Sequence, residues 1–183
     1  VKRDCNMMLT PLFTSPLDTA IGLERTTCQL IDVEVKDGEY VFGFEKLKRW
    51  IDLCKKCGIE YFEMSHLFSQ WGAKYAPKVV ATVNGKKEKI FGWHTPAVGE
   101  YTKFLESFLP QLTAKLRKWE IADVTYFHIS DEPREEHLES YKAAKESLGN
   151  MLDGFHTFDA LSSYEFYRHG LIDKPVPGNN EIE

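Results

Sequence analysis

The spacing of hydrophobic positions along the chain predicts helices that alternate with strands. After residue 45, apolar residues recur at intervals of three and four, so they share one face of a helix that ends near Gly58. The inward positions of this helix are Leu47, Trp50, Ile51 and Cys54. Further helices are predicted over residues 100–119, 135–149 and 164–169. Pro110 should kink or divide the first of these three, and Trp50 and Trp119 are expected in the core.

Short runs of β-branched and aromatic residues between the helices predict strands. The clearest run is residues 124–130, Val-Thr-Tyr-Phe-His-Ile-Ser. Other strands are predicted at residues 6–12, 28–35, 59–64 and 155–161. Asp37-Gly38 marks a turn, and the segment 174–180, with two prolines and a glycine, is expected to form a loop.

Residues 66–99 interrupt this alternation and are predicted to form an insertion. Within it, strands over 79–83 and 87–91 flank Asn84-Gly85, the pair favoured in two-residue hairpin turns. The insertion also contains His66, Trp71, Trp93 and His94. A segment of this length between regular elements often has a functional role.

The order strand, helix, strand, helix, strand predicts parallel strands joined by right-handed crossovers. The pattern supports at most five strands. A closed eight-stranded barrel needs about 250 residues, whereas this chain has 183. We therefore expect residues 1–183 to form one α/β domain. It is either a partial (β/α)₈ TIM-type barrel or a small open sheet, with a hairpin-containing insertion.

Composition narrows the possible partners. The chain has 23 Lys and Arg against 28 Asp and Glu, a formal net charge of −5 with no basic run, which argues against nucleic acid and anionic membranes. No apolar run is long enough to span a bilayer. The chain opens without a charged-then-apolar signal segment, which favours a cytoplasmic location.

The cysteines and histidines do not predict a metal or redox site. Cys54 and Cys57 lie at the end of a predicted helix, whereas a redox pair is expected at a helix start. A zinc site would need a second pair of ligands, which the spacing does not supply. We therefore expect no metal and no cofactor. The lack of a glycine-rich phosphate loop and of a G-x-S-x-G motif disfavours nucleotide binding and serine hydrolysis.

Polar residues gather where three of the predicted strands end. They are Glu63, Ser65 and His66 after one strand, His128, Ser130, Asp131 and Glu132 after the next, and Asp159 and Ser162 after the third. Because active residues of parallel α/β folds gather at the carboxyl ends of strands, we expect these side chains to form one site.

The sequence Asp131-Glu132-Pro133 has two interpretations. Proline at the first helical position, with acidic residues near the positive end of the helix dipole, is typical of a helix start. Alternatively, two adjacent carboxylates repel each other, so that one acts as an acid for a leaving group and the other as a fixed anion. Both interpretations can hold, since capping uses only part of the hydrogen-bonding capacity of a carboxylate.

The other candidates also have structural alternatives. Glu63 is either a partner carboxylate or a solvated strand end, and His128 either points into a barrel mouth or is a satisfied core histidine. Asp159 either caps a turn or binds a hydroxyl. Trp71 and Trp93 are either lids over the core or stacking platforms for a sugar ring.

Six segments form an ordered set. They are Tyr61–Phe68 (Tyr-Phe-Glu-Met-Ser-His-Leu-Phe), Gln70–Lys74 (Gln-Trp-Gly-Ala-Lys), Phe91–Trp93 (Phe-Gly-Trp), Tyr126–Pro133 (Tyr-Phe-His-Ile-Ser-Asp-Glu-Pro), Asn6–Thr19 and Phe158–Ser162. Together they resemble glycoside hydrolase family 123 and the uncharacterised bacterial domains related to it. The resemblance covers nearly the whole chain, and the set is far more specific than any single motif.

The resemblance implies a β-N-acetylgalactosaminidase on a (β/α)₈ barrel, with further barrel segments and an N-terminal β-sandwich domain in the parent protein. It implies a retaining mechanism assisted by the substrate. Glu132 would be the general acid/base, and Asp131 would orient and polarise the 2-acetamido group of the substrate. Tyr164 or another tyrosine is expected to support the acetamido oxygen. Substrate-binding roles are also expected for Glu63, His66, Gln70, Trp71, Trp93, His128 and Asp159.

We therefore expect a glycoside hydrolase that acts on β-linked N-acetylhexosamine in an oligosaccharide or glycoconjugate. One alternative is a glycosidase with two separated carboxylates, Glu63 and Glu132, that cleaves sugars lacking the acetamido group. Another is a non-catalytic carbohydrate-binding α/β domain, in which Asp131 and Glu132 only begin a helix.

Overall fold

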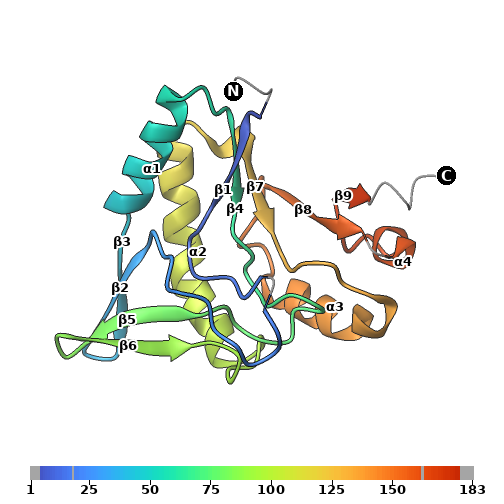
Figure 1. The fold of residues 1–183 in the computed structure, drawn as a ribbon, viewed down its shortest axis with the longest axis horizontal. Helices are drawn as coiled ribbons and strands as arrows, with labels where there is room; N and C mark the ends of the chain where they lie inside the picture. Colours follow the sequence, from blue (N-terminus) through green and yellow to red (C-terminus); the bar gives the residue numbers. More distant parts are fainter. Residues whose placement is uncertain (1–4, 18, 162, 178–183) are drawn as a thin grey trace.

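The computed structural model describes residues 5–17, 19–161 and 163–177, which form two sheets with helices packed against them (Figure 1). The larger sheet has five strands, all parallel, in the order β1-β4-β7-β8-β9. Its strands are β1 Met7–Thr10, β4 Tyr61–Met64, β7 Thr125–His128, β8 His156–Leu161 and β9 Lys174–Pro177. The parallel pairing expected from the order of elements is confirmed.

Helices connect consecutive strands of this sheet. They are α1 Glu45–Lys56, α2 Glu100–Lys118, α3 Leu138–Ser147 and α4 Tyr164–Arg168, with short 3₁₀ turns at Ala122–Val124 and Glu135–His137. Figure 1 shows α1 and α2 side by side next to β1, β4 and β7, with α3 and α4 near β8 and β9. Helix α1 begins and ends where the hydrophobic spacing predicts, and Gly58 after it has a φ of 83°.

The second sheet has four strands in the order β3-β2-β5-β6. The hairpin of the insertion, β5 Val79–Val83 and β6 Lys86–Phe91, is confirmed, and Asn84 and Gly85 adopt φ values of 50° and 79°. Such positive values at both central residues are what this two-residue turn requires. The hairpin pairs through β5 with β2 Asp32–Lys36, which forms its own hairpin with β3 Glu39–Gly43.

The two faces of the larger sheet differ in burial. Phe62, Met64 and Phe127 are fully buried in the hydrophobic core, whereas Glu63 and Tyr126 on the opposite face are only partly covered. Each large apolar side chain buried in this way contributes about 1.5–3 kcal/mol. The core continues through an aromatic cluster. Its rings belong to Phe13, Tyr40, Phe42, Phe91, Tyr101, Phe104 and Phe108.

Several expectations about these elements are wrong. The described residues form nine strands rather than at most five, because the count of five leaves out β3, β9 and the two strands of the hairpin. Lys174–Pro177 pairs with β8 instead of forming a loop, and residues 178–180 lie outside the described residues. Helix α2 is not divided at Pro110, because buried residues before and after the proline anchor it to one core.

The remaining expectations concern closure, tryptophans and cysteines. The five-stranded sheet is open, with β1 and β9 as its edges, so a closed barrel is not observed. Trp50 and Trp119 pack against the core but are only partly buried. Burial and the neighbouring Cys57 both raise the pKa of the Cys54 thiol. A reactive redox pair instead has a thiol of lowered pKa.

Within the part of the chain that the structure describes, every helix is too short or too polar to cross a membrane.

Candidate active site

The segments that follow β4 and β7 lie side by side. Backbone hydrogen bonds run from Leu67 N to His128 O at 2.9 Å and from Phe68 N to Ile129 O at 3.0 Å. Beyond the strand end, Trp71 N donates to Asp131 O at 2.9 Å. The expected neighbourhood of these two strand ends is therefore present, and it places the Trp71 loop against the Asp131-Glu132 pair.

His128 joins three strands through its side chain. Its Nδ1 lies 3.0 Å from Glu63 Oε1 on β4, and its Nε2 lies 2.8 Å from Asp159 Oδ1 on β8. Burial lowers the pKa of His128, but the hydrogen bonds and charges of Asp159 and Glu63 outweigh burial and raise that pKa to about 9. At neutral pH His128 is therefore an imidazolium that donates to both carboxylates.

Asp159 is fully buried and is surrounded by donors from the protein. Its carboxylate accepts hydrogen bonds from His128 Nε2, from the backbone N–H of Ser130 and Ala160, and from the hydroxyl of Tyr141 on α3. Four donors match the acceptor capacity of a carboxylate. The geometry thus gives Asp159 a positioning role beneath the site, and the predicted Ser162 beside it lies outside the described residues.

The side chains of Asp159, His128 and Glu63 are linked in a row by hydrogen bonds, which we call the Asp159–His128–Glu63 chain. Glu63 is its exposed end. The Glu63 side chain keeps 23% of its surface exposed, whereas His128 keeps 9% and Asp159 none. One oxygen of Glu63 is held by the imidazolium, so its carboxylate has a fixed orientation on the uncovered face of the sheet. Such an anion is placed to accept a hydrogen bond from a ligand hydroxyl.

His66 packs its ring on that of His128, with the ring centroids 3.7 Å apart. It is buried, and neither of its ring nitrogens has a hydrogen-bond partner within residues 5–17, 19–161 and 163–177. Burial lowers its pKa well below the usual value, and the positive His128 adds to the effect. A neutral, unsatisfied imidazole at a strand end is available to a polar group of a ligand.

One group of side chains has the geometry to hold a metal ion. Ligand atoms of His66, His128 and Asp131 all lie within 4.8 Å of one another. However, both nitrogens of His128 are donors to carboxylates, and a metal ligand must present a lone pair. The trio therefore does not fit a metal while His128 is protonated.

Asp131 and Glu132 follow β7 directly. Asp131 is partly buried and Glu132 is exposed. Glu132 adopts a φ of 42°, which non-glycine residues rarely do. Such strained positions concentrate at functional sites, where the surrounding structure holds them in place. No helix begins at Pro133, since the first turn after it is the 3₁₀ segment Glu135–His137, so the helix-start interpretation does not account for the pair.

Trp71 and Trp93 line a cavity of about 360 Å³ beside the catalytic candidates. Its other lining residues are Ile21, Ser69, Gln70, Lys74, Tyr75, Arg134, Glu136 and His137. Gln70 is buried and donates to Thr19 O, and Trp93 Nε1 donates to Leu23 O. The two tryptophans are partly exposed, so they are walls of this cavity rather than lids over the core.

The Trp71 loop is held tightly in place. Trp71, Gly72 and Ala73 have successive φ values of 57°, 105° and 54°. A Cβ at Gly72 would lie 2.7 Å from Cβ and Cγ of His137, so only glycine allows this close approach. Ser140 Oγ donates to Gly72 O at 2.7 Å, which ties the loop to α3.

The structure brings some candidates together and leaves one aside. Tyr164 is 64% exposed on α4, and its ring lies tilted against that of Tyr167, without a described contact to Glu63, His128 or Asp159. The sequence reasoning did not single out Tyr141, Lys74 or Arg134 as functional. Only the inward helical position of Tyr141 was apparent, because the partner of its hydroxyl depends on the tertiary fold.

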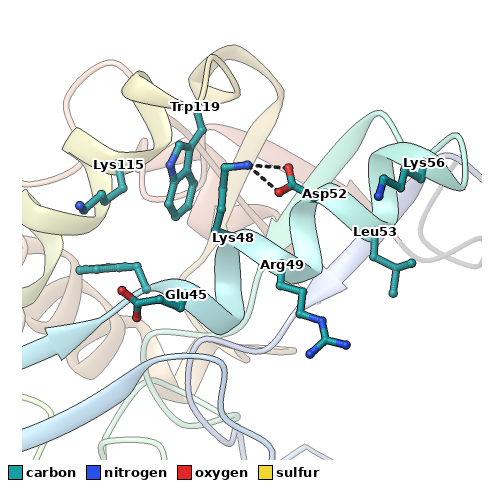
Figure 2. A pocket seen from close by; sticks show the side chains of 9 residues that line it. Glu45, Lys48, Arg49, Asp52, Leu53, Lys56, Lys115 and Trp119 are labelled. Carbon is teal, nitrogen blue, oxygen red and sulfur yellow. Dashed lines mark hydrogen bonds and ion pairs between the residues drawn. The ribbon is translucent and has the colours of Figure 1, made fainter.

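A larger cavity, of about 610 Å³, lies between α1 and α2, away from the strand ends (Figure 2). Lys48 pairs there with both oxygens of Asp52 at 2.6 Å, and Lys48 also lies over the ring of Trp119. Lys115 of α2 and Arg49 of α1 line it as well. None of the candidate residues lines this cavity, so its size does not make it the site.

The chain was compared with known proteins. The family model for the glycoside hydrolase 123 catalytic domain matches residues 1–183. No curated protein matches the chain. A solved structure, from a study of glycolipid glycan hydrolysis by a family 123 glycoside hydrolase from Clostridium perfringens, aligns with a TM-score of 0.68 and 16% identity. The alignment covers 97% of this chain and 31% of that chain, and it shows a shared fold.

Proposed function

Because the chain belongs to the family of glycoside hydrolase 123 catalytic domains, we propose that it cleaves β-linked N-acetylhexosamine, with N-acetylgalactosamine as the preferred sugar. The reaction is a retaining hydrolysis assisted by the substrate. The observation that carries the proposal is the Asp131-Glu132 pair, which follows β7 with Glu132 exposed and in a strained backbone conformation. The hydrolase studied for glycolipid glycans supports a glycan as the substrate class.

Glu132 is the general acid and then the general base. In the first step its carboxyl group donates a proton to the glycosidic oxygen, and the bond from that oxygen to the anomeric carbon breaks. In the second step the carboxylate removes a proton from the water that attacks the same carbon, and the bond from that carbon to the acetamido oxygen breaks, which restores the acetamido group. The exposure of Glu132 supports this role, because the group must reach both a leaving group and water.

Asp131 acts on the 2-acetamido group of the substrate. The carbonyl oxygen of that group attacks the anomeric carbon, and the cyclic oxazolinium intermediate that forms is cationic. A fixed carboxylate next to its N–H stabilises the developing charge. Substrate assistance of this kind needs no enzyme nucleophile, which is why two adjacent carboxylates suffice.

The Asp159–His128–Glu63 chain orients the sugar. The Glu63 carboxylate accepts a hydrogen bond from a sugar hydroxyl, and His128 holds Glu63 in place. His66 supplies an imidazole nitrogen with no partner among the described residues. Gln70, Trp71 and Trp93 bind the glycan from the adjoining cavity. We retain Tyr164 as a candidate for the acetamido oxygen.

The finer fold assignment belongs to the same proposal. Parallel strands with helices on one side and polar residues at the carboxyl ends are the arrangement of part of a (β/α)₈ barrel. In that arrangement the uncovered face of the sheet, with Glu63 and Tyr126, faces the barrel interior. Further barrel strands and a β-sandwich domain in the parent protein would complete it.

A glycosidase that uses Glu63 and Glu132 as separated carboxylates is the first alternative. The Glu63 carboxylate has one oxygen occupied by its hydrogen bond with the His128 imidazolium, which favours a positioning role for Glu63 and substrate assistance in the reaction. A non-catalytic carbohydrate-binding domain is the second alternative, and the test below separates the three.

The test uses this chain with Glu132→Gln, Asp131→Asn and the exposed control Glu139→Gln. Release of nitrophenol is measured from 4-nitrophenyl β-N-acetylgalactosaminide and from the matching β-galactoside. Glu132→Gln should reduce turnover of the acetamido substrate at least about a hundredfold, and Asp131→Asn should act on that substrate alone. Turnover of the galactoside would support the two-carboxylate alternative, and sugar binding without turnover would support the binding domain.

A thermal melt gives a second measurement that needs no turnover. An N-acetylgalactosamine thiazoline mimics the oxazolinium intermediate. At one hundred times its dissociation constant it should add about 2.7 kcal/mol to the stability of a folded binder. A melt that the thiazoline leaves unchanged would contradict an acetamido-assisted site in this chain.

A further inference from the structure

We propose that the cavity between Trp71 and Trp93 binds an anionic sugar residue, one that bears a carboxylate or a sulfate, next to the sugar that is cleaved. This inference deepens the proposed function and rests on it for the identity of the ligand as a glycan. It defines the substrate as an acidic glycan rather than a neutral one.

The walls of the cavity suit a sugar ring. Trp71, Tyr75 and Trp93 are partly exposed there, and the rings of Tyr75 and Trp93 meet edge to face with centroids 5.9 Å apart. The Trp93 indole is fixed by its hydrogen bond to Leu23 O at 2.9 Å. The cavity volume of about 360 Å³ falls in the range of small-molecule sites.

Two cations that line the cavity have no partner among the described residues. Lys74 and Arg134 both line it, and within the described parts of the chain neither side chain makes an ion pair or a hydrogen bond. By contrast, Lys48, Lys78, Lys89 and Lys145 are each paired with a carboxylate. A neutral sugar would leave both charges of the cavity unmatched.

The other titratable groups of the cavity do not cancel this charge. Burial lowers the pKa of His137, and the positive Lys74 and Arg134 lower it further against the opposing effect of Glu136, so His137 is neutral at pH 7. Its Nδ1 accepts a hydrogen bond from Arg134 N. Glu136 is the one carboxylate among the described lining residues, and its side chain is 71% exposed at the rim.

The cavity is therefore net positive on a chain whose formal net charge is −5. A guanidinium binds a carboxylate or sulfate through two parallel hydrogen bonds, and a lysine ammonium adds a point charge. Aromatic faces beside two cations match a ring that bears an acidic group. The cavity therefore recognises the negatively charged group that uronic acids and sulfated sugars have in common.

The position of the cavity relates it to the cleaved bond. Trp71 N donates to Asp131 O at 2.9 Å, and Arg134 follows Glu132 by two positions in the sequence. The cavity thus adjoins the proposed catalytic pair, and the proposal assigns the acidic sugar to it as the leaving group of the cleaved bond.

The test measures binding, so that turnover does not interfere. Glu132→Gln serves as the background, and calorimetry compares three disaccharides in which β-N-acetylgalactosamine is 1,4-linked to glucose, glucuronic acid or 6-O-sulfoglucose. At least one acidic disaccharide should bind about fivefold or more tightly than the glucose disaccharide. The preference should weaken as salt increases. The carboxylate and sulfate arms show which acidic group is preferred.

Variants then assign the preference to residues. Lys74→Met and Arg134→Met should each lower the acidic-to-neutral affinity ratio about fivefold, and Glu136→Gln should raise it. Lys86→Met, an exposed lysine at the β5–β6 turn, is the matched control and should leave the ratio unchanged. Melting curves of all variants verify folding.

The inference would be overturned by equal affinity for the three disaccharides or by absence of binding. It would also be overturned if the double variant Lys74→Met/Arg134→Met kept the acidic-to-neutral affinity ratio of the background. Failure of the proposed function has a different signature. In that case the acidic preference and its dependence on Lys74 persist, while the unsubstituted chain hydrolyses none of the disaccharides.

Discussion

The His128 imidazolium donates from Nε2 to Oδ1 of Asp159 across 2.8 Å, which links β7 to β8 through buried side chains. The same carboxylate accepts from Ser130 N and from the Tyr141 hydroxyl, so β7, β8 and α3 all depend on one negative charge. The rigidity of the candidate site therefore depends on the hydrogen bond between His128 and Asp159.

Asp159→Asn should lower the free energy of unfolding by about 3–5 kcal/mol, because it removes the buried one of the two carboxylates that pair with the His128 cation and turns one acceptor into a donor. Urea denaturation measures the loss. Asp153→Asn, at an exposed aspartate, is the control and should change stability by less than about 0.5 kcal/mol. Equal effects of the two substitutions would rule out a structural role for the His128–Asp159 link.

Stability should fall as the pH rises through the pKa of His128. That pKa is raised to about 9 in the folded protein, above the ordinary value of 6.5. The contribution of His128 is therefore fully present below pH 6.5 and is lost as the pH rises toward and through 9. Urea denaturation between pH 6.5 and 9.5 measures the slope. His128→Gln should remove the part of the pH dependence that His128 causes. An unchanged slope in that variant would contradict the raised pKa of His128.

His66→Phe should stabilise the chain by about 1 kcal/mol, because it removes two buried ring nitrogens that have no hydrogen-bond partner. The same substitution should weaken binding of the N-acetylgalactosamine thiazoline, because His66 is proposed to form a hydrogen bond with this ligand, as donor or as acceptor. His94→Phe, at an exposed histidine, controls for the added ring. Loss of stability with unchanged thiazoline binding would show His66 to be structural only.

Glu132→Gly should be more stable than Glu132→Ala by about 1 kcal/mol, since a φ of 42° strains a residue with a Cβ and not glycine. Both variants lack the carboxylate, so both should be inactive. Chemical denaturation of the pair isolates the backbone strain. If alanine were the more stable of the two, the strained conformation of this residue would not exist in solution.

Gly72→Ala should destabilise the chain by about 2–3 kcal/mol and weaken glycan binding, because its Cβ would meet the side chain of His137 at 2.7 Å and displace Trp71. Gly38→Ala is the matched control. It also has a positive φ, 84°, but a Cβ there has no atom within 4 Å. It should lose only about 1 kcal/mol and bind glycans normally. Similar losses for the two variants would exclude the contact with His137 as the cause.

Local patterns in the sequence determined most of the secondary structure. Helix α1 is indicated by its apolar spacing and by Gly58, and the β5–β6 hairpin by Asn84-Gly85, because both signals act within a few residues. The order of these elements also determined the parallel pairing of β1, β4, β7 and β8. Local signals did not reveal β9, since the pairing of Lys174–Pro177 with β8 depends on a distant partner.

The sequence by itself also placed Glu63, His128, Asp131 and Asp159 at strand ends, where parallel strands bring polar groups together. Only the tertiary structure decided their separate environments. Asp159 is enclosed by four donors and Glu63 remains partly exposed, yet both are carboxylates on the two strands that flank β7. That no described residue pairs with the charge of Lys74 or Arg134 likewise became apparent only in three dimensions. Burial and partner choice depend on contacts between residues far apart in the chain, and spacing along the sequence does not encode them locally.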